Sequence, residues 1–105
     1  MYNEVITLVS VRKEQNRFGD LVEVKTERQV FAKLLSIGSA EFYQAAASGM
    51  KPEVKFVLAD YLDYNGEQYI RYTPYGETKE REYSVIRQYR NGNQLELTCQ
   101  RGVDT

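Results

Sequence analysis

The chain contains no histidine, and this absence limits its chemistry. Histidine is the side chain whose unperturbed pKa lies nearest neutrality, and it is also the commonest metal ligand. Catalytic triads, dyads and zinc sites built on histidine are therefore excluded. A single cysteine excludes an internal disulfide and is typical of a reducing compartment.

Long apolar runs are also missing. No stretch approaches the ~20 apolar residues that a membrane-spanning helix needs, and residues 1–4 do not resemble a signal peptide. We therefore expect a protein that is made and used in a cytoplasm and has no membrane partner.

An excess of charge of one sign is lacking as well. The 14 lysines and arginines nearly balance the 15 aspartates and glutamates, which leaves a net charge of -1. The chain as a whole is therefore not attracted to DNA or to an anionic membrane. With 105 residues, it has room for one core, so we expect a single domain over residues 1–105.

Short strand patterns separated by turn residues dominate the chain. The polar turn 16–20 joins a strand over residues 5–12 to a long region over residues 21–37, which we expect to bend or split near Glu27 and Arg28 because 17 residues exceed an ordinary strand. Further strands are predicted over residues 54–59, 83–89 and 94–100. The pattern predicts a mainly β fold: a small antiparallel barrel or sandwich with one short inserted helix.

One helix is predicted over residues 39–48. Ser39 is expected to cap its start, Glu41 to complement the helix dipole, and Gly49 to end it in a left-handed turn. Two hairpin turns are predicted downstream, at Asn65-Gly66 and at residues 91–93, with a polar loop over residues 73–81 between them.

The order of these elements resembles the phage head-tail joining family, also called head completion, stopper or head-tail adaptor proteins. The resemblance covers nearly the whole chain and rests on Phe18-Gly19, Ala32, Glu41-Phe42, the run 83–86 and the run 95–99. It implies a structural, non-enzymatic protein of the virion neck that is made in the cytoplasm of the bacterial host.

The resemblance also implies partners. Members bind as a ring, implied to be dodecameric, below the portal or adaptor proteins of the head, close the DNA exit channel, and present a surface to the tail completion protein. Packaged DNA is only passing or retained cargo, and no cofactor is implied. The insertion over residues 38–52 would face the channel or a partner, with candidate residues Ser39, Glu41, Phe42, Tyr43, Gln44 and Met50. Alternatively, its helix plugs one end of the barrel with Phe42 in the core.

Tyrosines and arginines concentrate in the C-terminal half of the chain. Such residues are enriched at protein interfaces and also in single-stranded nucleic-acid platforms. The acidic residues among them favour a protein interface, and a small β-barrel module that binds single-stranded nucleic acid is the alternative function. The candidates are Tyr64, Tyr69, Arg71, Tyr72, Tyr75, Arg87 and Arg90.

Two further patterns have simpler interpretations. Asp60, Asp63 and Glu67 could hold a divalent cation, or Asp60 and Glu67 could form a carboxylate-only catalytic pair, but a solvated hairpin rim is the favoured interpretation. Cys99 lies on the same face of an alternating run as Leu95 and Leu97, so we expect a buried and inert thiol. We therefore predict no metal site and no catalytic residue.

Overall fold

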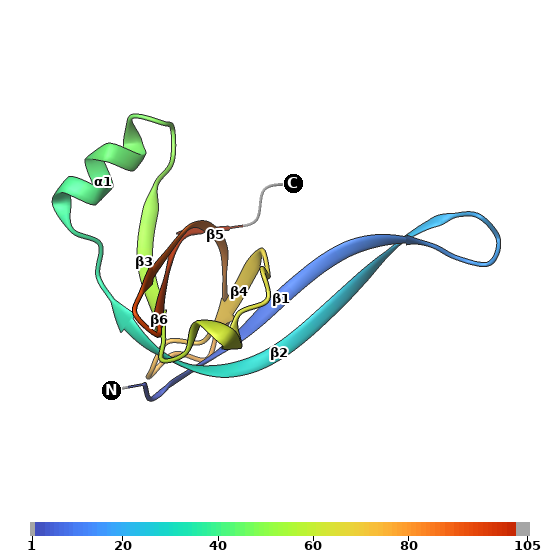
Figure 1. Ribbon diagram of the computed structural model, residues 1–105, viewed down its shortest axis with the longest axis horizontal. Coiled ribbons are helices and arrows are strands. Elements are labelled where there is room, and N and C mark those ends of the chain that lie inside the picture. Colours follow the sequence, from blue (N-terminus) through green and yellow to red (C-terminus); the bar gives the residue numbers. More distant parts are fainter. Residues whose placement is uncertain (1, 103–105) are drawn as a thin grey trace.

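A computed structural model describes residues 2–102 and contains six strands in one closed antiparallel sheet (Figure 1). The strand order is β1-β2-β3-β6-β5-β4, and β4 pairs with β1 to complete the barrel. The elements are β1 (Glu4–Gln15), β2 (Leu21–Leu35), α1 (Ser39–Ala46), β3 (Pro52–Leu58), the 3-10 turn η1 (Tyr61–Asp63), β4 (Tyr69–Tyr72), β5 (Arg81–Asn91) and β6 (Gln94–Arg101). The predicted fold class, mainly β with one short inserted helix, is confirmed. No helix within residues 2–102 is long and apolar enough to cross a membrane.

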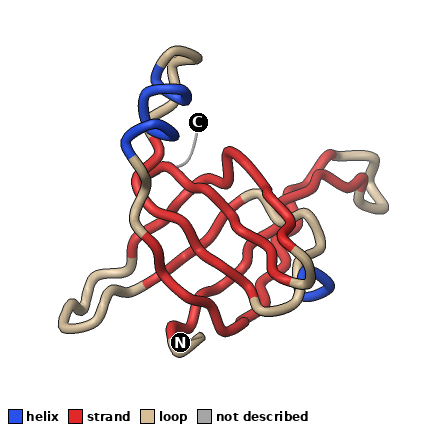
Figure 2. The backbone as a smooth tube through the Cα atoms, turned by 60° about the vertical axis from the view of Figure 1, so that its left-hand side comes forward, coloured by secondary structure: helices blue, strands red, loops and turns tan. Residues whose placement is uncertain are grey.

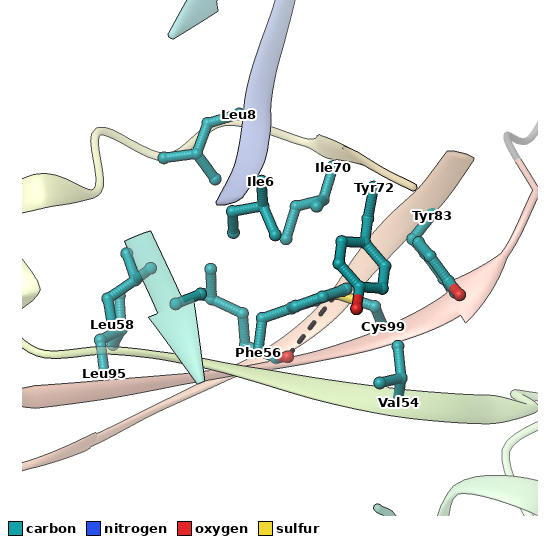
Figure 3. Packing of buried hydrophobic residues seen from close by; sticks show 12 residues of the cluster. Ile6, Leu8, Val54, Phe56, Leu58, Ile70, Tyr72, Tyr83, Leu95 and Cys99 are labelled. Atoms are coloured by element: carbon teal, nitrogen blue, oxygen red, sulfur yellow. Dashed lines mark hydrogen bonds between the residues drawn. The ribbon is translucent and has the colours of Figure 1, made fainter. Parts of the chain in front are cut away.

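The barrel interior is filled by alternate residues from all six strands (Figure 3). Phe56 is at the centre, with its ring edge-to-face against Tyr72 at 5.4 Å and Tyr83 at 5.6 Å. Cys99 is fully buried, and burial raises the pKa of its thiol to about 12. The expected burial of Cys99 is confirmed, and a raised pKa disfavours the reactive thiolate at neutral pH.

β1 and β2 extend well beyond the barrel. They pair continuously from Glu4 with Ala32 to Gln15 with Leu21. Only residues 7–9 of β1 also pair with β4, and only residues 33–35 of β2 also pair with β3. The part of this hairpin over residues 10–26, here called the arm, projects from the barrel as a two-stranded ribbon (Figures 1 and 2).

The continuous β2 corrects one sequence-based expectation. The predicted split near Glu27 and Arg28 is wrong, because β2 runs unbroken from Leu21 to Leu35. Its first part is held by β1 alone and its last residues by β3, so a single long strand serves both the arm and the barrel. The polar turn at the arm's tip is confirmed, with Gly19 at a φ of 84° and the Asn16 side chain accepting from two backbone N–H groups.

The predicted hairpin at Asn65-Gly66 is wrong. Gly66 does adopt a positive φ, but the residues before it form η1 rather than a strand. The cause is Glu67, which is only 5% exposed and is not part of a solvated rim. Its carboxylate accepts from the Asn65 N–H at 2.7 Å and pairs with Arg28 at 2.8 Å. The loop therefore folds around a buried charge, because such a charge needs hydrogen-bond donors. Within residues 2–102 no cluster of acidic, histidine or cysteine side chains is placed to hold a metal ion.

Candidate partner-binding surfaces

The insertion between β2 and β3 carries α1, and its two ends differ from each other. Ser39 is the first helical residue and makes no capping hydrogen bond; Gly38, in an extended conformation, occupies the N-cap position. The predicted cap at Ser39 is therefore wrong. At the other end, Gly49 takes a φ of 79°, and the N–H groups of Gly49 and Met50 bond back to the carbonyls of Ala46 and Ala45. The predicted left-handed end at Gly49 is confirmed.

α1 lies outside the barrel and buries none of its residues (Figures 1 and 2). Phe42 is 40% exposed and Tyr43 is 72% exposed, with their rings edge-to-face at 5.9 Å. A plug with Phe42 in the core is therefore wrong. The physical reason is that Phe56 and its neighbours already fill the barrel and leave no space for a second phenylalanine.

Glu41 anchors α1 to the outer face of the sheet. Its carboxylate lies 2.8 Å from Lys55 Nζ, accepts from the Thr98 hydroxyl at 3.2 Å, and lies 3.9 Å from the Arg87 guanidinium. The hydrogen bond from Lys55 lowers the pKa of Glu41, and the same bond raises the pKa of Lys55. Lys55 and Thr98 face each other on the paired strands β3 and β6. The sheet itself therefore positions both polar groups that bind the Glu41 carboxylate.

A cleft of about 250 Å³ separates α1 from the sheet beside this anchor. Gln44, Ala45 and Met50 line it from the insertion, and Ile86, Arg87 and Thr98 line it from the sheet. Ile86 is the extra residue of a bulge in β5, where the register with β6 shifts between Val85 and Arg87. Sequence reasoning missed Lys55, Thr98 and Ile86, because no local pattern marks a bulge or pairs residues 41 and 98.

The predicted aromatic residues do not lie on one surface. Tyr72 is 5% exposed, and its hydroxyl donates to Glu4 at 2.9 Å, so its expected role at a surface is wrong. Tyr64 is half-buried, and its hydroxyl donates to the carbonyl of Glu67. Burial raises the pKa of both phenols to about 12, with the nearby carboxylates Glu4 and Glu67 adding to the shift. Tyr69 is partly exposed on β4, and Tyr75 is fully exposed in the loop before β5.

The predicted arginines are equally dispersed. Arg71, on β4, pairs with Glu27 on β2 across the intervening strand β1. Arg90 stacks on the ring of Tyr61, 3.5 Å from its centroid, while Arg87 lies at the cleft beside α1. These positions come from different faces of the barrel. The structure therefore brings together the candidates of the insertion with Arg87, but not the aromatic and arginine set as a whole.

Comparison with known proteins gives a similarity in fold. No family model and no curated protein sequence matches the chain. Among solved structures, the solution structure of protein SF1141 from Shigella flexneri 2a superimposes with a TM-score of 0.76 at 17% sequence identity, covering 99% of this chain and 96% of that one. The chain is thus similar to SF1141 in fold over its whole length, and at this identity the similarity extends to the fold alone.

Proposed function

We propose that this chain is a structural phage or prophage head completion protein. In this proposal it binds as a ring below the portal, closes the DNA exit channel, and provides the attachment surface for the tail. The proposal rests first on the order of elements, which resembles the head-tail joining family over nearly the whole sequence.

The observation that carries the proposal is the position of residues 38–52. A segment that closes a channel must lie outside its own core and must be able to move without unfolding the domain. Residues 38–51 of this insertion include no buried residue, expose Phe42 and Tyr43, and are held to the sheet mainly through Glu41. Small side chains at positions 45–47 would let copies from neighbouring subunits approach closely near a ring axis.

The test uses the phage or prophage that encodes the chain. Deleting its gene is expected to give full-sized heads that leak DNA and carry no tails, visible by negative-stain electron microscopy and by nuclease-sensitive DNA. Normal tailed particles from the deletion strain would overturn the proposal.

Complementation then isolates the insertion. A glycine-serine segment of equal length in place of residues 39–50 is expected to keep the melting temperature nearly unchanged and yet fail to restore tailed particles. Leu62→Ala removes a similarly exposed apolar side chain from η1 and is the matched control, expected to complement fully. An unfolded glycine-serine variant would overturn the role given to this segment.

A further inference from the structure

The arm leaves one strand edge of the molecule open. In an antiparallel pair, residues that hydrogen-bond each other alternate with residues that do not. At the turn, the Asn16 N–H donates to the carbonyl of Asp20, so the hydrogen-bonded pairs of β1 and β2 join even-numbered residues. The even-numbered residues of β2 therefore direct their N–H and C=O groups toward β1, and the odd-numbered residues direct theirs away. From Lys33 to Leu35, the same side of β2 pairs with β3. Within residues 2–102 no strand pairs with this side of β2 between residues 21 and 31, which we call the open edge.

The opposite edge of the arm is protected. β4 covers residues 7–9 of β1. Beyond it, the Gln68 side chain accepts from the Val11 N–H at 3.1 Å and donates to the Val11 carbonyl at 3.3 Å, so that it imitates one further residue of a pairing strand. Only Lys13 and Gln15 remain on that side. A free, long strand edge is a template for pairing with another chain, and of the two edges of the β1–β2 hairpin only the β2 edge is long.

The side chains along the open edge of one copy are complementary in charge and polarity to those along the open edge of a second copy. In an antiparallel pairing of two copies about a two-fold axis at Thr26, Lys25 faces Glu27 of the second copy. By symmetry, Glu27 faces Lys25 of the second copy. At the ends Leu21 faces Phe31, and these are exposed by 71% and 66% in the single chain. Opposite charges and apolar pairs placed directly across from each other stabilise such a pairing.

Neighbouring registers are penalised. A shift of two residues keeps the outward N–H and C=O groups matched, because the hydrogen-bond pattern repeats every two residues. In one direction the shift places Lys25 opposite Lys25 and Glu23 opposite Glu27. In the other direction it places Glu27 opposite Glu27. Like charges directly opposite are destabilising, so the charge pattern selects the register centred on Thr26.

We propose that the open edge of β2 binds a second copy of this chain, which joins the β1–β2 hairpins of the two copies into a four-stranded antiparallel sheet with its two-fold axis at Thr26. The six outward-facing residues of each strand then pair their backbone groups across the axis. A head-to-tail pairing of β2 with β1 is disfavoured, because Gln68 and β4 leave only two β1 residues free. This dimer does not depend on the proposed ring, whose subunits would meet head to tail through two different surfaces.

The first test exchanges charges. In sedimentation experiments from about 1 µM to about 1 mM, the full chain is expected to show a reversible monomer–dimer equilibrium. Lys25→Glu and Glu27→Lys each replace two attractive pairs by two repulsive ones, so each should raise the dissociation constant about tenfold or more. A mixture of the two variants restores opposite charges at both positions and should form a heterodimer about as tightly as the unaltered chain.

Folding controls accompany this test, because Glu27 also contacts Arg71. Circular dichroism and melting temperature should show that both variants are folded. Lys25→Pro provides a further check, because it removes one outward N–H that the single chain does not use, and it should abolish the dimer while leaving the barrel folded. A chain that stays monomeric at every concentration, or variants that dimerise as well as the unaltered chain, would overturn the proposal.

The second test determines where along β2 the two-fold axis of the dimer lies. At Thr26 the two Cα atoms would lie about 4.5 Å apart across a non-hydrogen-bonded pair, within the range that a disulfide spans. Thr26→Cys should therefore give a covalent dimer on mild oxidation. Val24→Cys is the matched control on the same face, with its two copies about 13 Å apart, and should stay uncrosslinked. Cys99 is buried and does not compete. Equal crosslinking of both variants would overturn the assigned register, and masses larger than a dimer that are insensitive to these changes would indicate a ring contact instead.

Discussion

The barrel and the arm are built from the same two strands, β1 and β2, and yet they differ in what stabilises them. In the barrel β1 is flanked by β2 and β4, β2 pairs with β1 and then with β3, and inward side chains such as Ile6 and Ala32 are fully buried. In the arm each strand has one neighbour, and Leu21 and Phe18 are exposed. Burial of apolar surface is the dominant favourable term in folding, so the barrel should carry most of the stability.

The comparison also separates two uses of apolar side chains. The apolar side chains of the barrel pack against one another around Phe56. In the arm and in α1, by contrast, large apolar side chains such as Phe18, Leu21 and Phe42 are exposed to solvent. A two-stranded ribbon alone is only marginally stable in water. The arm therefore depends on its turn, on the barrel end of β1 and β2, and on any partner that covers its edge.

The largest effect is expected from Phe56→Ala. This change removes a fully buried ring between Tyr72 and Tyr83, and it should lower the free energy of unfolding by about 3–5 kcal/mol. Denaturant unfolding would measure it. Phe18→Ala at the arm's tip is the control, expected within about 0.5 kcal/mol of the unaltered chain. Similar losses from both changes would show that the arm is as tightly packed as the barrel.

A smaller loss is expected where the arm meets the barrel. Glu67→Ala leaves the Asn65 N–H without its acceptor and removes the partner of Arg28, which should cost about 1–3 kcal/mol. Arg28→Ala leaves the buried Glu67 carboxylate with the Asn65 N–H as its remaining donor, so its cost should be comparable to that of Glu67→Ala. Hydrogen exchange of the η1 loop would locate the change. An unaltered unfolding curve for Glu67→Ala would contradict the importance of this buried carboxylate.

The turn of the arm gives a third comparison. Gly19 has a φ of 84°, so Gly19→Ala should be destabilising by about 1 kcal/mol, through backbone strain rather than a clash. Gly38 is the matched control, because its φ of -71° suits any residue and a Cβ there meets no atom within 4 Å. Gly38→Ala places a less favourable residue at the N-cap of α1 and should cost about 0.5 kcal/mol or less in the same melting experiment. Equal effects would mean that the arm's turn does not need its left-handed residue.

The smallest effect concerns the anchor of α1. Because Lys55 lowers the pKa of Glu41, their pairing contributes stability above the unfolded pKa near 4.5 and loses it as pH falls through the lower folded pKa. The raised pKa of Lys55 acts in the opposite direction, so its contribution is lost only as pH rises above 10.5 and through the folded value. Glu41→Gln should therefore cost less than about 1 kcal/mol at neutral pH. The difference in melting temperature should disappear in acid, and a constant difference down to pH 2 would contradict the ionic anchor.

Much of the fold could be predicted because its signals are local. The alternation around Cys99, the positive φ at Gly19 and Gly49, and the hairpin between β5 and β6 each depend on a few neighbouring residues. The incorrect hairpin prediction has a cause that is not local. Asn65-Gly66 has the composition of a hairpin turn, but the burial of Glu67 against Arg28, 39 residues away, imposes a different loop.

The sequence by itself determined the mainly β class, most of the turns, the burial of Cys99, and the absence of histidine chemistry, since these follow from composition and from periods of two residues. Only the tertiary structure decided that β2 is unbroken, that Glu41 is bound to Lys55 and Thr98, that Gln68 protects one edge of the arm, and that the other edge is open. The physical reason is that these features join residues far apart in the chain. Such contacts depend on which strands become neighbours when the sheet closes, and no local pattern encodes that outcome.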